Sequence, residues 1–258
     1  MPCPHPTSAP RAVLLLAATI SALGTTPRAA AAQAGEWNTV HQPSTWVNAF
    51  AEQPVGARTS LWFDGHWRRM NLGNEPQQLL LRPGVLFALS ERVRLGAGYT
   101  YVATAPYGES PAPAPTREHR AWQHVQVGAR AGETALSLRL RWEQRWLAPV
   151  SGGETQDFRY FQRARVLVRA QRPLAGWRLD AGAVGLYAFN EYFLPVGHLD
   201  GDQYRIQNRA SVGLALPITP TQRVDVGYMN LYNRIPQRST RELNHTLTLG
   251  WVYTGARP

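Results

Sequence analysis

The chain has 258 residues and a formal net charge of +10, and all 27 of its basic residues are arginine. A basic balance is typical of proteins that bind nucleic acid, anionic lipid or anionic solutes. The arginines alternate along strand-like segments instead of gathering in one patch, so we expect no nucleic-acid partner. A mean hydropathy of −0.32 is compatible with a membrane barrel, because half of its strand residues face a wet interior.

The N-terminal segment has the features of a secretory signal peptide. A basic residue precedes an apolar run over 12–23, and small residues follow at 32–34. The run is shorter than the ~20 apolar residues that a membrane-spanning helix needs. The single cysteine, Cys3, lies in this segment, so we expect no disulfide in the exported protein. We predict a signal peptide over 1–34 and a single barrel domain over 35–258.

Alternating apolar and polar residues predict β-strands along the exported chain, because successive side chains of a strand point to opposite faces. We found no pattern typical of an amphipathic helix. In segment 92–103, Val93, Leu95 and Tyr99 alternate with Arg94 and Thr100. The expected strands cover 37–42, 45–52, 58–68, 77–88, 92–104, 118–130, 134–147, 158–171, 177–190, 203–216, 222–233 and 242–253.

The connections between these strands alternate in length from residue 89 onward. The short ones are 90–91, 132–133, 173–176 and 217–221, and the long ones are 105–117, 148–157, 191–202 and 234–241. Short turns at one end and long loops at the other are typical of outer-membrane barrels. An even strand count then places both chain ends on the periplasmic side. We predict an all-β, antiparallel transmembrane β-barrel of 12 strands, with ten strands as the alternative.

Aromatic residues near the strand ends predict belts at the two membrane interfaces, where a ring meets both lipid and headgroup. In a soluble sandwich, core aromatics are expected at mid-strand instead. The expected outer belt contains Tyr101, Trp146, Phe158, Tyr160, Tyr187, Phe189, Tyr204 and Tyr232, and the inner belt contains Trp177, Trp251 and Tyr253.

The polar strand face carries many more arginines than acids. Hairpin register predicts that Arg169 lies opposite Asp180 and that Glu143 lies close to Arg163. Two functions stay open: ion pairs that fill a closed structural barrel without transport, or a small channel or binding barrel for anions such as acidic sugars or other carboxylates. The candidate lumen and anion-binding residues are Arg139, Arg141, Glu143, Arg145, Arg163, Arg165, Arg169, Asp180 and Arg209.

An enzymatic role is the least favoured class. Some outer-membrane barrels are lipid hydrolases that use serine and histidine, and His124 and Ser137 share the inward face of neighbouring strands. The predicted register separates them by four residues, roughly 13 Å at the rise of a strand. A nucleophile and its base need a contact of about 3 Å. We therefore expect no enzyme, no catalytic residue, no metal and no cofactor.

Several segments resemble an uncharacterised bacterial family catalogued as domain of unknown function 2490. They are HRAWQHVQVGAR (119–130), LRLRWEQRW (138–146), RYFQRARVLVR (159–169), YAFNEYFL (187–194), QNRASVGLAL (207–216) and VDVGYMNLY (224–232). The resemblance extends from about Trp37 to Tyr253 and implies an outer-membrane β-barrel, but it transfers no catalytic residue.

The location that the resemblance implies suggests three partners: outer-membrane lipid, periplasmic chaperones and the barrel-assembly machinery. The family's motifs draw attention to Glu143, Arg145, Asn190, Glu191, Asn208 and Arg209. We expect Asn190 and Glu191 to cap a turn, because they lie at the predicted end of a strand.

Overall fold

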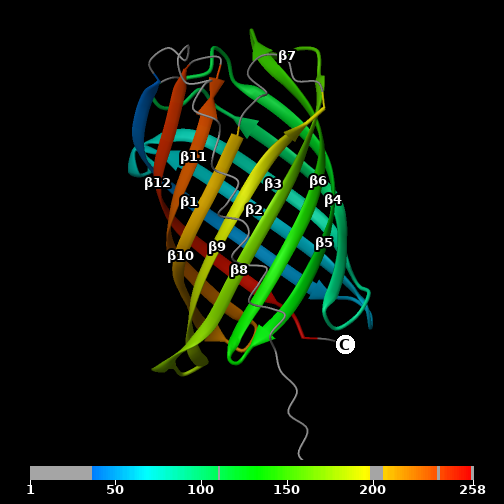
Figure 1. Ribbon diagram of the computed structural model, residues 1–258. Helices are drawn as coiled ribbons and strands as arrows, with labels where there is room; N and C mark the ends of the chain where they lie inside the picture. The colour runs from blue at the N-terminus through cyan, green and yellow to red at the C-terminus, as the bar shows by residue number, and fades with distance from the viewer. Residues whose placement is uncertain (1–36, 110, 198–205, 237–238, 257–258) are drawn as a thin grey trace, which may run out of the picture. The chain divides into compact units, whose positions relative to one another are not determined.

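The computed structural model describes residues 37–109, 111–197, 206–236 and 239–256 (Figure 1). The predicted signal peptide, 1–34, lies outside the described residues. Among the residues that are described, no helix is long and apolar enough to cross a membrane. The strands are β1 (Asn38–Pro54), β2 (Thr59–Met70), β3 (Glu75–Ala88), β4 (Val93–Thr104), β5 (Thr116–Ala131), β6 (Thr134–Ser151), β7 (Glu154–Thr155), β8 (Arg159–Leu179), β9 (Gly182–Val196), β10 (Ile206–Thr219), β11 (Gln222–Ile235) and β12 (Thr240–Thr254), with a short 3-10 helix, η3 (Asn71–Gly73), after β2.

The twelve strands form one closed barrel, in which β7 pairs only with the end of β6 and stays outside the wall. Consecutive wall strands are antiparallel, and the wall closes where β1 and β12 pair in parallel, from Asn38 with Thr240 to Glu52 with Thr254. Without β7 the wall has an odd number of strands, so its first and last strands must run in the same direction. The predicted fold class, an all-β antiparallel barrel, is confirmed apart from this one parallel seam. In the described residues the wall has eleven strands, and β7 brings the total to twelve, so the twelfth strand is not a separate wall strand at 37–42 as predicted.

The first two predicted strands, 37–42 and 45–52, form one continuous strand, β1. Pro43, which we assigned to a turn, lies inside it. The ladder between β1 and β2 begins only at Ser44, so Pro43 sits where one edge of β1 is unpaired and a missing amide hydrogen is tolerated. The start of β1 and the end of β12 therefore lie at opposite ends of the barrel. The prediction that both chain ends share one side is wrong.

The long connections gather at one end of the barrel, here called the long-loop end, as the alternation predicts. The opposite end, the short-turn end, carries the tight hairpins, such as 132–133 between β5 and β6 and 180–181 between β8 and β9. The prediction of a turn at 173–176 is wrong, because β8 continues through these residues to Leu179. Its pairing with β9 has a register shift between Pro173 and Arg178. The residues of the predicted turn therefore belong to a strand, and 174–176 lie in its bulge without a partner on β9.

The wall is apolar outside and charged inside, the reverse of a soluble domain. On β6, Leu140 is 46% exposed whereas Glu143 is 0% exposed. The same alternation holds on β4, where Leu95 and Tyr99 are exposed and Thr100 is buried. The face assignments predicted for these two strands are confirmed.

Outward aromatic residues bond to outward polar side chains toward both ends of the barrel. Trp142 Nε1 donates a hydrogen bond to Gln162 Oε1 at 3.0 Å. Near the short-turn end, Trp251 Nε1 donates to Gln222 Oε1 at 3.1 Å. Each ring thus has its polar atom satisfied within the protein while the ring body remains on the exposed apolar surface.

Two aromatic residues of the predicted outer belt point into the barrel instead. Tyr187 is 4% exposed, and the guanidinium carbon of Arg169 lies 4.4 Å from its ring centroid. Phe189 packs against a buried apolar cluster. The face assignment fails here because 186–189 is apolar at every position, so the alternation gives no signal. Tyr204 lies outside the described residues.

Candidate functional site

A connected network of ion pairs fills the middle of the lumen. Glu143 accepts hydrogen bonds from Arg163 Nη2 at 2.5 Å and from Arg165 Nη1 at 2.6 Å. Glu191 accepts from Arg165 Nη2 at 2.7 Å and from Arg139 Nη2 at 3.1 Å. Each carboxylate serves two guanidinium groups, and Arg165 joins the two carboxylates into one network.

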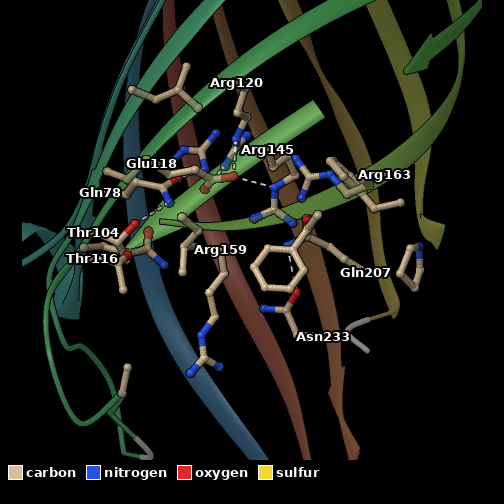
Figure 2. A pocket seen from close by; sticks show the side chains of 18 of the residues that line it. Gln78, Thr104, Thr116, Glu118, Arg120, Arg145, Arg159, Arg163, Gln207 and Asn233 are labelled. Atoms are coloured by element: carbon tan, nitrogen blue, oxygen red, sulfur yellow. Dashed lines mark hydrogen bonds and ion pairs between the residues drawn. The ribbon is translucent and has the colours of Figure 1, made fainter. Parts of the chain in front are cut away.

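A third buried carboxylate, Glu118 on β5, holds two further arginines. Its Oε1 and Oε2 accept from Arg120 Nε at 2.8 Å and Nη2 at 2.7 Å, a bidentate arrangement. Arg145 Nε also donates to Glu118 Oε1, and Figure 2 shows Glu118 between the two guanidinium groups. The pairing predicted between Glu143 and Arg163 is confirmed, and it belongs to a network larger than single pairs.

Asp64 on β2 provides the fourth buried carboxylate. It lies directly opposite Arg82 on β3 and accepts from Arg82 Nη1, while His66 contacts its other oxygen. Arg82 Nε also donates to Thr100 Oγ1 at 3.2 Å. Buried ion pairs thus occur on both sides of the barrel, from β2 to β9.

An aromatic plug, formed by Trp122, His124 and Arg141, fills the lumen beside this network. Trp122 is 0% exposed, its ring stacks on His124 at 5.4 Å, and the guanidinium carbon of Arg141 lies 4.5 Å from it. A Cβ at Gly84 or Gly98 would lie 2.5 Å from Cζ2 of Trp122. These two glycines, on the adjacent strands β3 and β4, let the ring lie close over the neighbouring part of the wall.

A cavity of 1270 Å³ opens at the long-loop end, and we call it the cup. Its acidic lining residues are Glu118, Asp157 and Glu242. Its arginines are Arg68, Arg82, Arg120, Arg145, Arg159, Arg163, Arg165 and Arg209. A smaller cavity of 250 Å³ at the short-turn end shares no lining residue with the cup. Trp122, His124, Arg141 and Glu143 are buried in the lumen and line neither cavity.

Two arginines of the cup are buried without a close carboxylate. The guanidinium carbon of Arg68 lies 3.7 Å from the Trp46 ring centroid, and within the described parts of the chain Arg68 has no ion pair with a carboxylate. The nearest carboxylate to Arg209 is Glu191, at 3.7 Å. In the described residues, Nε of both arginines lacks a hydrogen-bond partner.

Each of these two arginines keeps one hydrogen bond to an amide. Arg68 Nη1 donates to Gln78 Oε1 at 2.5 Å. Arg209 Nη2 donates to Gln207 Oε1 at 3.4 Å. Burial of a guanidinium group without a carboxylate within hydrogen-bond distance is costly, so positive charge at the base of the cup is only partly compensated.

All the predicted lumen residues except Asp180 belong to the inward face. Asp180 lies in the turn between β8 and β9 and is exposed. Arg169 pairs across the strands with Phe189, not with Asp180, and its nearest carboxylate is Asp225, at 3.8 Å. The predicted ion pair is wrong because the hairpin turns several residues later than its sequence indicates.

The two positions expected to cap a turn lie in the middle of β9 instead. Glu191 is 3% exposed and belongs to the central ion pairs. Asn190 points outward and accepts a hydrogen bond from Asn208 Nδ2 on β10 at 2.8 Å. The prediction of a cap is wrong because β9 extends to Val196.

Sequence reasoning did not identify Trp46, Asp64, Arg68 and Arg82 as parts of the site. Asp64 and Arg68 are four residues apart in a predicted strand, so the period of two could have placed both on one face. Arg82 is followed by Pro83 and Gly84, which interrupt the alternation. The ion pair of Asp64 with Arg82 depends on the register between β2 and β3, which no local pattern gives.

The register confirms the separation of His124 and Ser137. His124 is the partner of Arg141, and Ser137 is the partner of Gly128, four residues along β5. In the ranges that the structure covers, no group of three or more histidine, cysteine or acidic side chains is placed to hold a metal ion.

Comparison with known proteins identifies relatives without an assigned activity. Residues 44–242 match the model of a family described as protein of unknown function, DUF2490. An uncharacterized protein of Methylorubrum extorquens is 30% identical over 240 residues, which cover 91% of this chain and 95% of the relative. No solved structure matches the chain significantly.

Proposed function

The chain belongs to the DUF2490 family, and from this premise we propose that it is an outer-membrane barrel that binds a small anionic solute in the cup without conducting it through the lumen. The observation that carries the proposal is the pair of buried arginines, Arg68 and Arg209, that lack a close carboxylate at the base of the cup. Under this proposal the protein is a binding barrel and not an enzyme.

The outer surface of the barrel supports the membrane location. Large apolar side chains such as Phe63, Leu140 and Val212 are exposed on the wall, and water would leave them unfavourably solvated. The closed wall leaves a strand edge unpaired only at strand ends, such as the first residues of β1, which fits a bilayer whose core excludes open sheet edges. The outward contacts are then with outer-membrane lipid.

The ends of the barrel support an orientation. In bacterial outer-membrane barrels the short turns face the periplasm and the longer loops face outward. The cup then opens to the outside of the cell, where it meets solutes from the medium. Export through the predicted signal peptide, 1–34, and insertion by periplasmic chaperones and the barrel-assembly machinery belong to the same proposal.

The charge of the cup supports an anion as its ligand. Eight arginines and three acids line it, and Arg159 extends into the open space (Figure 2). The outer part of a low-dielectric cavity lined by one sign of charge concentrates counter-ions. A closed structural barrel is the second candidate, and the ion pairs of Glu143 and Glu191 favour it. Such a barrel does not need two buried arginines that line a cavity and have no carboxylate within hydrogen-bond distance.

Isothermal titration of the refolded, detergent-solubilised protein with succinate and with inorganic phosphate tests the proposal. We expect binding of at least one anion, and a loss of about tenfold or more in affinity in the double variant Arg68→Gln/Arg209→Gln, because charged hydrogen bonds contribute about 1.5–3 kcal/mol each. The matched control is Arg94→Gln, whose ion pair with Glu52 lies away from the cup.

Planar-bilayer recording tests the other half of the proposal. A blind lumen gives no conductance steps. Regular conductance steps with anion preference would show a channel and contradict the blind cup, and the absence of any anion binding would leave the closed structural barrel.

A further inference from the structure

Resting on the proposed function, we propose that the cup recognises a hydroxylated anion, a sugar acid or a sugar phosphate, and not a compact inorganic ion or a polyanion. Its anionic group lies against Arg68 and Arg209, and its hydroxyl groups lie along polar side chains higher in the cup. Three independent features of the cup lead to this ligand class: its uncompensated charge, the setting of the two arginines and the chemistry of the walls.

The uncompensated charge of the cup is small. Five of its arginines donate a hydrogen bond to a buried carboxylate: Arg82, Arg120, Arg145, Arg163 and Arg165. Across the described residues, only Arg68, Arg159 and Arg209 of the lining arginines have no carboxylate within hydrogen-bond distance. A ligand with one or two negative charges matches this balance. A highly charged polyanion would be repelled by the acidic side chains of the cup and would find no further free arginine donors.

The two buried arginines are held flat by aromatic rings. The guanidinium carbon of Arg68 lies 3.7 Å from the centroid of Trp46. That of Arg209 lies 4.3 Å from the centroid of Phe193 and 5.0 Å from that of Trp46. Stacking covers the faces of the guanidinium groups and leaves their N–H edges as the donors. Planar forks of this kind suit the paired oxygens of one carboxylate or phosphate.

The walls above the arginines carry a strip of hydrogen-bonding side chains. Gln207 Nε2 donates to Asn233 Oδ1 at 2.7 Å, and Asn233 Nδ2 donates to Glu242 Oε2 at 3.0 Å. On the other side, at the level of Arg68, Gln78 accepts a hydrogen bond from Arg68 Nη1 at 2.5 Å and donates from Nε2 to Thr104 Oγ1 at 2.8 Å, and Figure 2 shows the two groups of polar side chains on opposite sides of the cavity.

This strip fits hydroxyl groups better than further anionic groups. Glu242 is an acceptor with no donor of its own when ionised, and the amides and hydroxyls offer both roles. A ligand hydroxyl can donate to the carboxylate and accept from an amide, whereas a second carboxylate beside Glu242 would be repelled. Sugars carry such hydroxyls on both faces of a ring.

The size of the cup also matches a sugar-based ligand. Its volume is 1270 Å³, above the ~300–1000 Å³ of most small-molecule pockets. A lone phosphate or acetate would leave most of this space to water. A ligand of one to a few sugar rings can reach from the arginines to the polar strip.

Isothermal titration with four probes tests the ligand class on the full exported chain. The probes are glucuronate, glucose 6-phosphate, glucose and glutarate, which together separate charge from hydroxyl groups and carboxylate from phosphate. We expect glucuronate or glucose 6-phosphate to bind at least about tenfold more tightly than glutarate, since one or two hydrogen bonds give such a ratio, and glucose to bind no more tightly than glutarate. The stronger of the two acidic sugars identifies the anionic group.

Two variants locate the hydroxyl contacts. Asn233→Leu should lower the affinity for the acidic sugar to near that of glutarate and leave the affinity for glutarate unchanged. Gln123→Leu, on the outer wall, is the matched control and should change neither. Retained electrophoretic heat-modifiability shows that each variant is folded.

The outcomes separate the two proposals. Equal affinities for glutarate and the acidic sugars would overturn the hydroxylated ligand and leave an anion-binding cup. Binding of none of the acids would overturn the proposed function itself. Glucose that binds as tightly as the acidic sugars would overturn the role of Arg68 and Arg209.

Discussion

The two halves of the lumen differ in how they are filled. In the half next to the long loops, buried carboxylates each hold two or more arginines around an open cavity, as Glu143 does with Arg163 and Arg165. Beside these ion pairs and from there toward the short turns, aromatic rings pack against glycines, as Trp122, the cross-strand partner of Glu143, does against Gly98, and the cavity at the short-turn end is only 250 Å³.

The difference teaches that charge does not by itself make a pore. The arginines are most numerous where the lumen widens, but the ion pairs at their base and the rings beside them lie buried in the lumen. Under the proposed function a solute therefore reaches the charged half from one end only. The following predictions alter each half in turn, from the largest expected effect to the smallest.

Removing the charge of Glu143 should have the largest effect on stability. Glu143→Gln leaves Arg163 and Arg165 without one of their carboxylates in a buried site, and breaking a buried ion pair costs about 3–5 kcal/mol. Urea-induced unfolding in detergent or lipid vesicles measures the loss. The matched control is Glu133→Gln, because Glu133 is an exposed residue at 3.9 Å from Arg172. Equal losses in the two variants would contradict a buried network that supports the barrel.

Crowding the aromatic half should have a smaller effect. A Cβ at Gly98 would lie 2.3 Å from the carbonyl oxygen of Pro83 and 2.5 Å from Trp122, so Gly98→Ala forces the wall or the ring to shift. Overpacking of this kind costs about 1–3 kcal/mol. Gly128→Ala is the control, since its nearest atoms would be 3.8 Å away. The same unfolding assay compares the two variants. An unchanged free energy of unfolding in Gly98→Ala would show that the plug rearranges at little cost.

A partly exposed ion pair near the short-turn end should contribute less than the buried network. Arg223 Nε donates to Asp225 Oδ1 at 2.8 Å, with the arginine side chain 34% exposed. Exposed pairs contribute less than about 1 kcal/mol, so Arg223→Gln should shift the unfolding midpoint only slightly. A loss as large as that of Glu143→Gln would remove the contrast between the two halves.

Much of the wall could be predicted because a strand with one apolar face shows alternating apolar and polar residues in its own sequence. β4 and β6 carry this pattern along their whole length, and the inward arginines of β6 follow from it. β9 does not, since 186–189 is apolar throughout, and there the inward and outward faces were exchanged. Pro43 was assigned to a turn because proline is rare inside a fully paired strand. The sequence does not show that this part of β1 has one unpaired edge, where proline is tolerated.

The site was predictable only as a set of inward arginines. Whether an arginine is paired or free depends on the register between strands, and the bulge in β8 displaced Arg169 from Asp180. The unpaired state of Arg68 and Arg209 depends on four separate strands and two aromatic rings. No spacing along the chain encodes that arrangement.

The parallel seam between β1 and β12 also constrains how the molecule forms. Each antiparallel neighbour can fold as a local hairpin, but Ser44 Oγ and Thr246 Oγ1, 2.6 Å apart across the seam, are 202 residues apart in the chain. Contacts of such high sequence separation form late and slowly. Until then the sheet keeps two open edges that invite pairing with other chains. The last step of folding is thus the pairing of two edges that run in the same direction, so β1 has to keep its edge free until β12 has formed.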